Sequence, residues 1–301
     1  MLVSTKVPEL FTTQDALASG LTRKRLDAMV ANREIVRVLW GVYRRADVED
    51  SVVTRARAAA LVVTPSSVLT DRTAAWIHGV DTFDYRELEL LPPLEVFVLR
   101  GCSRIERRGC VGGERDLFSY DICVIGGVRV TTPLRTAMDL GCRLSRSDGL
   151  AALDGFMRLF GLAHDDFYAE LPRYRRRRGV VQLRQLVPLA DPRAESPGES
   201  WVRLAIVDGG IPLPQPQFWV EDESGEPLFR VDLAYPLNKV CVEYDGREFH
   251  TSGEDRAYDA RRRRWLVDHG WTVIVVTKDD FAFERLVAWR GELRRALGIA
   301  V

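Results

Sequence analysis

The amino-acid sequence predicts an α/β protein built from more than one domain. Its 301 residues exceed the roughly 100–200 residues of a typical domain, so we expect two or three domains. Near the N-terminus, two short helical patterns precede two strand-like runs. The last hundred residues alternate a helix, antiparallel strands, a charged helix and an apolar strand, which indicates an α/β layer arrangement. We therefore divide the chain into 1–50, 51–190 and 191–301.

The composition excludes several classes of protein. Acidic and basic residues balance at 43 each, so net charge does not argue for nucleic-acid binding, although arginines cluster at 173–178 and 261–264. The five cysteines are scattered, which argues against a disulfide framework and a zinc site. No apolar run approaches the roughly 20 residues that span a bilayer, and MLVSTKVPELFTTQD lacks the layout of a signal peptide. We expect a cytoplasmic protein without a membrane partner.

The first fifty residues carry clear helix-start signals. Thr12 or Thr13 can cap a helix that ends at Gly20, and Thr22 can cap a second helix over Arg23–Ala31. Two β-like runs follow, at 35–39 and 42–44, joined by Trp40-Gly41. This order of elements is typical of a winged helix-turn-helix domain, whose second helix enters the major groove of DNA.

Basic side chains stand where such a domain meets DNA. The second helix would present them at its N-terminal end, and the wing would contact phosphates. The candidate DNA-binding residues are Arg23, Lys24, Arg25, Arg33, Arg37 and Arg44. The alternative is a small helical cap that uses the same pattern without DNA.

Residues 51–190 predict a mixed α/β region. RARAAALVV and VLTDRTAAWIHGV indicate helices, LEVFVLRG indicates a strand, and DICVIGGVRVTTP indicates a hairpin that turns at Gly126-Gly127. Pro133 opens a helix that we expect Gly141 to stop. His78 and Asp139 are interpreted as structural polar groups, because no further catalytic residues surround them in the sequence.

The last block begins with a strong helix signal. Ser196, Pro197 and Glu199 supply an N-cap, a first-position proline and a capping-box glutamate for a helix that runs to about Asp208. A strand (PQFWV), the hairpin VDLAYPLNKVCVEYDG, a charged helix (EDRAYDARRRRWLVDHG), a strand (WTVIVVT) and a terminal helix follow.

The hairpin places acids among residues that ought to be buried. If Leu237 and Asn238 form a two-residue loop, Asp232 lies directly opposite Glu243, with Cβ atoms about 4.5–5.5 Å apart. Asp245 shares a face of its strand with Glu243. Like charges at this separation need compensation, and Mg²⁺ (or Mn²⁺) held by carboxylate oxygens is the simplest. A register slip of one residue would turn one set of side chains to the other face.

Two parts of the chain resemble the AbiEi family, the antitoxin half of a type IV toxin–antitoxin pair. The resemblance rests on TTQDALASGLTRKRLDAMV and IVRVLWGVYRR near the N-terminus, and on TAAWIHG and RVTTPLRTAMDL in the middle region. It implies binding to DNA, often to the protein's own promoter, and a cognate toxin or antitoxin partner.

The last hundred residues resemble a second family. SPGES, VDLAYPLNKVCVEYDGREFH and DARRRRWLVDHGWTVIVVT are similar to the Vsr-like (very short patch repair) branch of the PD-(D/E)xK, or restriction endonuclease-like, superfamily. The resemblance implies a Mg²⁺-dependent endonuclease in which Asp232, Glu243 and Asp245 hold metal and Glu199 orients a metal-bound water.

The same resemblance assigns roles to residues that follow the hairpin. His250 would act at the scissile phosphate, Asp255 or Asp259 would support it, and Arg262 would contact the DNA backbone. Asp245 stands where many members of the superfamily have lysine, which fits the Vsr-like branch.

Two functions follow from these patterns. The first is a metal-dependent DNA endonuclease with a winged-helix domain, in a toxin–antitoxin or phage-defence setting. The alternative is a non-catalytic DNA-binding regulator of the AbiEi antitoxin type. A structural role is the alternative to a catalytic role for Glu199, since the capping box alone would account for this residue.

Overall fold

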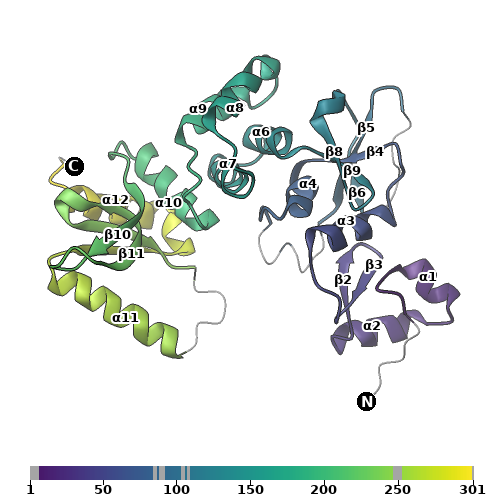
Figure 1. Ribbon diagram of the computed structural model, residues 1–301, viewed down its shortest axis with the longest axis horizontal. Helices are drawn as coiled ribbons and strands as arrows, with labels where there is room; N and C mark the ends of the chain where they lie inside the picture. Colours follow the sequence, from purple (N-terminus) through teal and green to yellow (C-terminus); the bar gives the residue numbers. More distant parts are fainter. Residues whose placement is uncertain are drawn as a thin grey trace. The chain divides into compact units, whose positions relative to one another are not determined.

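A computed structural model describes residues 7–83, 87, 92–102, 106, 109–246 and 253–299, with side chains of the last range from 259 onward. The chain forms two compact units, Met1–Leu140 and Gly141–Val301 (Figure 1). Both units contain helices and sheets, as the predicted α/β class requires. The predicted boundaries near 50 and 190 lie inside these units.

The first unit begins with the helices and hairpin that the capping signals predict. Thr12 starts the first helix through a capping box with Asp15, and Thr22 caps the second. Hydrophobic side chains such as Phe11, Leu26 and Ile35 form its core. The elements are β1 (Leu10–Thr12), α1 (Thr13–Ala18), α2 (Arg23–Ala31), β2 (Ile35–Leu39) and β3 (Val42–Arg45).

The sheet of this segment has the order β1-β3-β2. Strand β1 was not predicted, because three residues are too few to show an alternating pattern. It pairs with β3 from Leu10↔Arg44 to Thr12↔Val42 and so brings the start of α1 against the hairpin.

A larger sheet fills the rest of the first unit. Its strand order is β6-β5-β4-β9-β8, with β7 also paired to β5. The predicted strand at Leu94–Leu99 and the hairpin that turns at Gly126-Gly127 are both present. The elements are α3 (Val52–Ala60), β4 (Ser67–Leu69), α4 (Asp71–His78), β5 (Leu94–Leu99), β6 (Cys110–Val111), β7 (Glu114–Arg115), η1 (Ser119–Asp121), β8 (Ile122–Ile125), β9 (Val128–Thr131) and α6 (Pro133–Arg143).

Charged side chains form a buried network beside this sheet. Arg115 Nη2 lies 2.7 Å from Asp71 Oδ2, and its Nη1 lies 3.2 Å from Asp139 Oδ2. Arg135 Nε lies 2.8 Å from the same Asp139 oxygen, and its Nη1 lies 3.1 Å from Asp121 Oδ2. Each buried carboxylate therefore has a cationic partner, as burial of charge requires.

His78 and Asp139 are structural, as the sequence indicated. The Nε2 atom of His78 lies 2.7 Å from the carbonyl oxygen of Thr131, inside the protein. Burial lowers the pKa of His78, because the charged imidazolium is poorly solvated there.

Gly141 does not stop α6, contrary to the prediction. The helix continues to Arg143, and a Cβ atom at 141 would lie 2.7 Å from Leu183 Cδ1. Close packing against Leu183, rather than a helix end, explains this glycine.

The second unit begins with helices, which a four-stranded sheet and two further helices follow. The helical elements are α7 (Arg146–Phe160), α8 (His164–Glu170), η2 (Leu171–Tyr174), α9 (Val180–Leu186), η3 (Val187–Leu189) and α10 (Pro197–Asp208). The remaining elements are β10 (Gln215–Glu221), β11 (Pro227–Tyr235), η4 (Pro236–Asn238), β12 (Val240–Tyr244), α11 (Gly253–Asp268), β13 (Thr272–Val276), η5 (Lys278–Phe281) and α12 (Phe283–Ala296).

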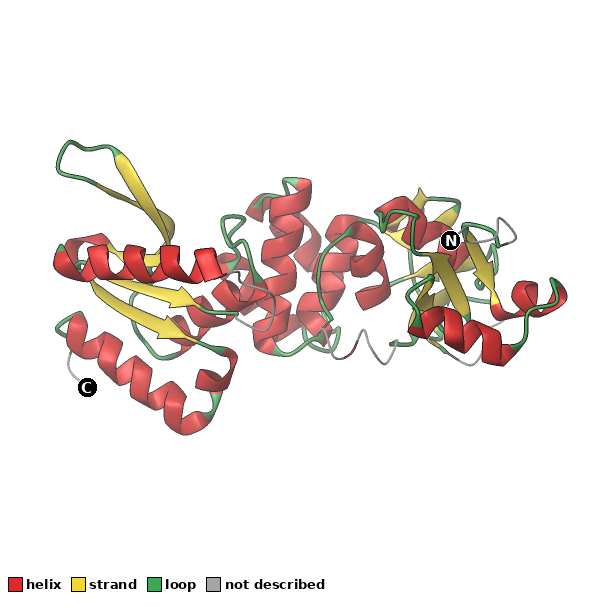
Figure 2. Cartoon of the chain, turned by 90° about the horizontal axis from the view of Figure 1, so that it is seen from below, coloured by secondary structure: helices red, strands yellow, loops and turns green. Residues whose placement is uncertain are grey.

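The sheet of the second unit lies between helices, as Figure 2 shows. Its order is β10-β11-β12-β13, antiparallel except for the parallel pair β12–β13. Helices α10 and α12 pack on one core cluster through Ile206 and Leu293. Helix α11 contributes Leu266 to another cluster that contains Cys241. Side chains that share a face of β12 with Cys241 therefore lie on the side of α11.

Candidate nucleic-acid interface and acidic cluster

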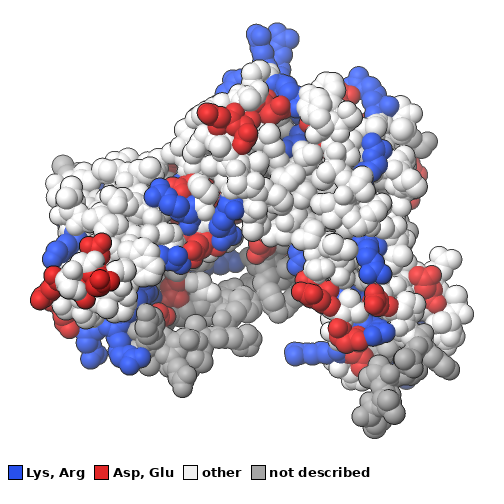
Figure 3. All heavy atoms as spheres, viewed as in Figure 1, with Lys and Arg blue, Asp and Glu red and all other residues white. Residues whose placement is uncertain are grey.

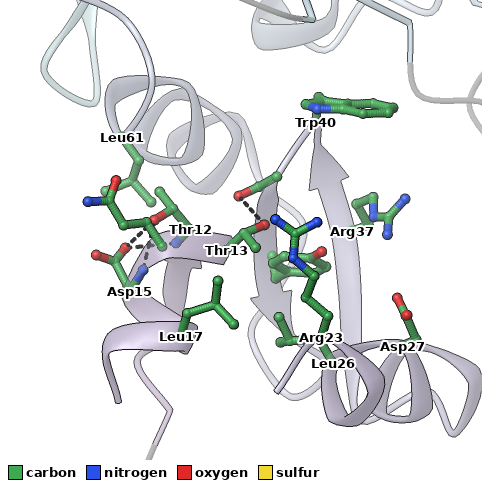
Figure 4. A pocket seen from close by; sticks show the side chains of 13 residues that line it. Thr12, Thr13, Asp15, Leu17, Arg23, Leu26, Asp27, Arg37, Trp40 and Leu61 are labelled. Atoms are coloured by element: carbon green, nitrogen blue, oxygen red, sulfur yellow. Dashed lines mark hydrogen bonds between the residues drawn. The ribbon is translucent and has the colours of Figure 1, made fainter. Parts of the chain in front are cut away.

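A groove of about 950 Å³ opens between α1, α2 and the β2–β3 hairpin. Figure 4 shows Arg23 reaching from α2 toward the hairpin, where Arg37 projects from β2. Trp40, at the hairpin turn, also lines the groove and is 43% exposed. The groove therefore offers two guanidinium groups and one exposed aromatic ring, and Asp15 and Asp27 also line it.

Local sequence builds this groove. The backbone N–H of Thr13 donates to the carbonyl oxygen of Gly41 at 2.8 Å and ties the start of α1 to the hairpin turn. Gly41 has a φ of +71°, a conformation that glycine adopts without steric cost. Asp15 accepts the backbone N–H of Thr12 within the capping box, which lowers its pKa.

The predicted DNA-binding residues of α2 are all exposed. Of these, Arg23 lines the groove, whereas Lys24 and Arg25 do not. Arg25 Nη2 lies 3.5 Å from Glu34 Oε2.

The structure gives the remaining predicted basic residues different environments. Arg37 is exposed, with its guanidinium carbon 5.6 Å from the Tyr43 ring centroid. Arg33 is exposed, with a left-handed φ of 57°. Arg44 is half-buried, and its Nη1 donates to the carbonyl oxygens of Val48 and Arg45. Arg44 thus supports the chain after the hairpin.

The arginine run at 173–178 lies between α8 and α9. Arg173 pairs with Glu170, and the Arg177 guanidinium carbon lies 4.7 Å from the Tyr174 ring centroid. The other three members, Arg175, Arg176 and Arg178, are exposed. Figure 3 shows basic side chains projecting over this end of the molecule and also gathered along α11.

The hairpin of the second unit has the predicted register but a longer turn. Leu233 pairs with Val242 and Tyr235 pairs with Val240, so Asp232 lies opposite Glu243 on continuation of the ladder. The predicted two-residue loop is wrong. A 3-10 turn over Pro236–Asn238 and a left-handed Lys239 join the strands and preserve the register.

Asp232 lies near two other carboxylates. Burial and the negative charges of Glu199 and Glu243 raise the pKa of Asp232 to about 7. A hydrogen bond of 2.9 Å from the backbone N–H of Tyr244 to Asp232 Oδ2 opposes that shift. The register thus sets Asp232 opposite Glu243, and Glu199 of α10 is near enough to affect the pKa of Asp232.

Close packing of α10 positions Glu199. A Cβ atom on the preceding Gly198 would lie 2.1 Å from the Tyr244 ring, so only glycine permits this approach. Ser196 caps α10 by accepting the backbone N–H of Glu199 at 3.2 Å, and its hydroxyl donates to Glu199 Oε1 at 2.8 Å. Glu199 also accepts from Gln217 Nε2 at 2.7 Å. Gln217 has a left-handed φ of 51°, an uncommon conformation for this residue type.

Two arginines of α11 donate hydrogen bonds to Glu243. Arg262 binds both oxygens of Glu243, with Nη2 3.1 Å from Oε2. Arg263 Nε lies 3.2 Å from the same Oε2, and its Nη2 lies 3.4 Å from Asp245 Oδ2. Arg262 was predicted to contact DNA, but here its guanidinium faces an acid inside the protein. Asp259 Oδ1 lies 3.7 Å from Arg262 Nη2.

Two predicted site residues cannot be placed. His250 lies outside the described residues, and so does the side chain of Asp255, which falls within α11.

The acids do not present an open metal site in this arrangement. Both Glu243 oxygens accept hydrogen bonds from guanidinium groups, so Mg²⁺ or Mn²⁺ would have to displace Arg262 and Arg263. Within the described ranges, no group of three or more His, Cys, Asp or Glu residues is arranged to hold a metal ion. The predicted ligand set therefore does not fit a divalent cation while α11 is in place.

Sequence comparison finds a family match in the middle of the chain. The family model for the AbiEi antitoxin C-terminal domain matches residues 66–189, which include the end of the first unit and the start of the second. Both quoted middle-region motifs lie inside this match, which confirms that part of the predicted AbiEi resemblance.

Two relatives span most of the chain. The uncharacterized proteins MT2308 and Rv2248, from Mycobacterium tuberculosis strains CDC 1551 / Oshkosh and ATCC 25618 / H37Rv, are each 32% identical over 260 residues. The aligned region covers 86% of this chain and 92% of each relative. The chain belongs to the family of these two mycobacterial proteins.

A solved structure also shows a weak likeness. The crystal structure of the RV2827C protein from Mycobacterium tuberculosis aligns over 71% of this chain and 84% of its own, with 10% identity and a TM-score of 0.32. Among the helices of the described ranges, none has the length and apolar character needed to cross a membrane.

Proposed function

We propose that this protein is a DNA-binding regulator of the AbiEi antitoxin type, with a cognate toxin as its functional counterpart. The match of residues 66–189 to the AbiEi antitoxin C-terminal domain carries this proposal. The first unit supports it, because helix, helix and hairpin follow in the order of a winged helix-turn-helix domain and Arg23 and Arg37 line the groove between them.

Phosphate contacts are the expected role of the groove. Arg23 and Arg37 reach it from a helix and a strand respectively. Guanidinium groups bind phosphates through two parallel N–H donors, and such contacts fix the register of a protein on DNA. The nearby exposed Lys24, Arg25 and Arg33 add positive charge on the same segment.

A binding assay tests the regulator. Fluorescence anisotropy with the duplex upstream of the protein's own coding sequence, at several salt concentrations, should reveal a preferred site and a steep salt dependence. Arg23→Gln/Arg37→Gln should weaken binding, whereas the matched control Arg285→Gln, 61% exposed on α12, should not. Equal affinity for the upstream duplex and unrelated DNA would reject the proposal.

One observation favours a second candidate, a DNA endonuclease of the second unit. Burial, together with the negative charges of Glu199 and Glu243, raises the pKa of Asp232 to about 7. Metal-assisted cleavage would require Arg262 and Arg263 to leave Glu243 first. Plasmid incubation with Mg²⁺ or Mn²⁺ tests this candidate: no cleavage by the wild type, or equal cleavage by Asp232→Ala, would reject it.

A further inference from the structure

The acidic cluster of the second unit already contains its own cations. Glu243 is almost fully buried, with a side chain 3% exposed, and both its oxygens accept from α11. Arg263 bridges Glu243 and Asp245, which lie two residues apart on the same side of β12. The two guanidinium groups are themselves largely buried, at 15% and 25% exposed.

Burial makes this pairing strong. A buried carboxylate without a partner is costly, and so is a buried guanidinium, so each side chain holds the other in place. Arg262 makes the bidentate contact that matches the fork of a guanidinium to a carboxylate. Its Nη1 also lies 3.2 Å from the carbonyl oxygen of Arg230 on β11, which further fixes the side chain.

We infer that Arg262 and Arg263 are the resident counter-ions of this acidic cluster and close it to divalent cations. A divalent cation would compete with Arg262 and Arg263 for Glu243, because both oxygens of Glu243 already accept hydrogen bonds from these arginines. The inference concerns the resting state of the second unit, and it is independent of whether the first unit binds DNA.

The same helix provides a matched control. Arg261 and Arg264 flank the pair in sequence, and both are exposed. Neutralising them removes the same formal charge from α11 but leaves every contact with Glu243 and Asp245 intact. A difference between the two double variants therefore reports the contacts rather than the net charge.

Mn²⁺ binding to the full chain without DNA tests the inference. Electron paramagnetic resonance would give the Mn²⁺ affinity of the wild type, of Arg262→Gln/Arg263→Gln and of Arg261→Gln/Arg264→Gln. We expect the first variant to bind Mn²⁺ at least roughly tenfold more tightly, because it loses the hydrogen bonds of both guanidinium groups and even one charge-assisted bond corresponds to a factor of about ten to a hundred. The control should bind like the wild type, and Glu243→Gln in the first variant should abolish the gain.

Three results would overturn the inference. These are equal Mn²⁺ affinity in the wild type and in Arg262→Gln/Arg263→Gln, an equal gain in the control, and a gain that survives Glu243→Gln. If circular dichroism shows that the double variant does not fold, Arg262→Gln replaces it, because this change frees Oε1 of Glu243 while Arg263 still contacts Oε2. A smaller gain is then expected, and no gain would overturn the inference. Failure of DNA binding in the separate anisotropy assay would leave this result unaffected.

Discussion

Replacing Arg135 by methionine should destabilise the first unit more than any surface change. Arg135 lies on α6 with a side chain only 3% exposed, between Asp121 at 3.1 Å and Asp139 at 2.8 Å. Methionine fills a similar length but has no charge and no donor. The substitution therefore leaves Asp121 and Asp139 buried with one cation fewer between them.

The magnitude follows from these contacts. Each hydrogen bond between charged groups contributes about 1.5–3 kcal/mol, and two are lost. Breaking a buried ion pair by removing one partner costs about 3–5 kcal/mol, which agrees with that sum. The exposed pair Arg100–Asp116, at 77% and 63% exposure, is the control. Arg100→Met should cost no more than about 1 kcal/mol, because solvent screens that pair.

Amide hydrogen exchange on the full chain is the suitable assay. The protein has two compact units, so global unfolding is not a two-state process, whereas exchange reports opening of each segment separately. The free energy of opening of α6 and β9 should fall by about 3–5 kcal/mol in Arg135→Met. A fall below about 1 kcal/mol, equal to the Arg100→Met control, would refute the claim that this network is desolvated.

Three further predictions concern other parts of the chain. If Arg23 and Arg37 each neutralise one phosphate, the slope of log affinity against log salt should become shallower by about 1.8 in Arg23→Gln/Arg37→Gln, and an unchanged slope would exclude both contacts. Because burial lowers the pKa of His78, the folded state disfavours its charged form, so the first unit should lose stability as the pH falls below about 6.5. His78→Gln should reduce that pH dependence in denaturant-dependent hydrogen exchange of α4, and an identical pH profile would contradict this role. Gly198→Ala should destabilise the second unit by about 1–3 kcal/mol, because the new Cβ would lie 2.1 Å from the Tyr244 ring. Gly291→Ala in α12, where the nearest atom is 3.7 Å away, should be neutral or stabilising, and similar losses in both variants would argue against the clash.

Local signals in the sequence predicted most elements of secondary structure. Caps at Thr22 and Ser196 correctly marked α2 and α10, because the capping hydrogen bond is made within three residues. The predicted register of the hairpin is present although the predicted loop is wrong, because the turn over Pro236–Asn238 with Lys239 joins the strands in the same pairing. Gly141 misled the prediction, because its reason is a contact with Leu183, more than forty residues away.

The partners of the buried charged side chains come from distant parts of the chain, so the tertiary structure determines them. Asp71, Arg115 and Arg135 look like ordinary surface residues in the sequence, yet folding brings them into one buried network. The acids of the hairpin were predicted to need a bound Mg²⁺ or Mn²⁺, whereas in the structure Arg262 and Arg263 pair with Glu243 and Asp245. The sequence alone could not show this pairing, because the contacts with Glu243 depend on how α11 packs against the sheet. Alternation and capping act over a few residues and can be read directly, whereas compensation of a buried charge depends on whichever group tertiary packing places beside it.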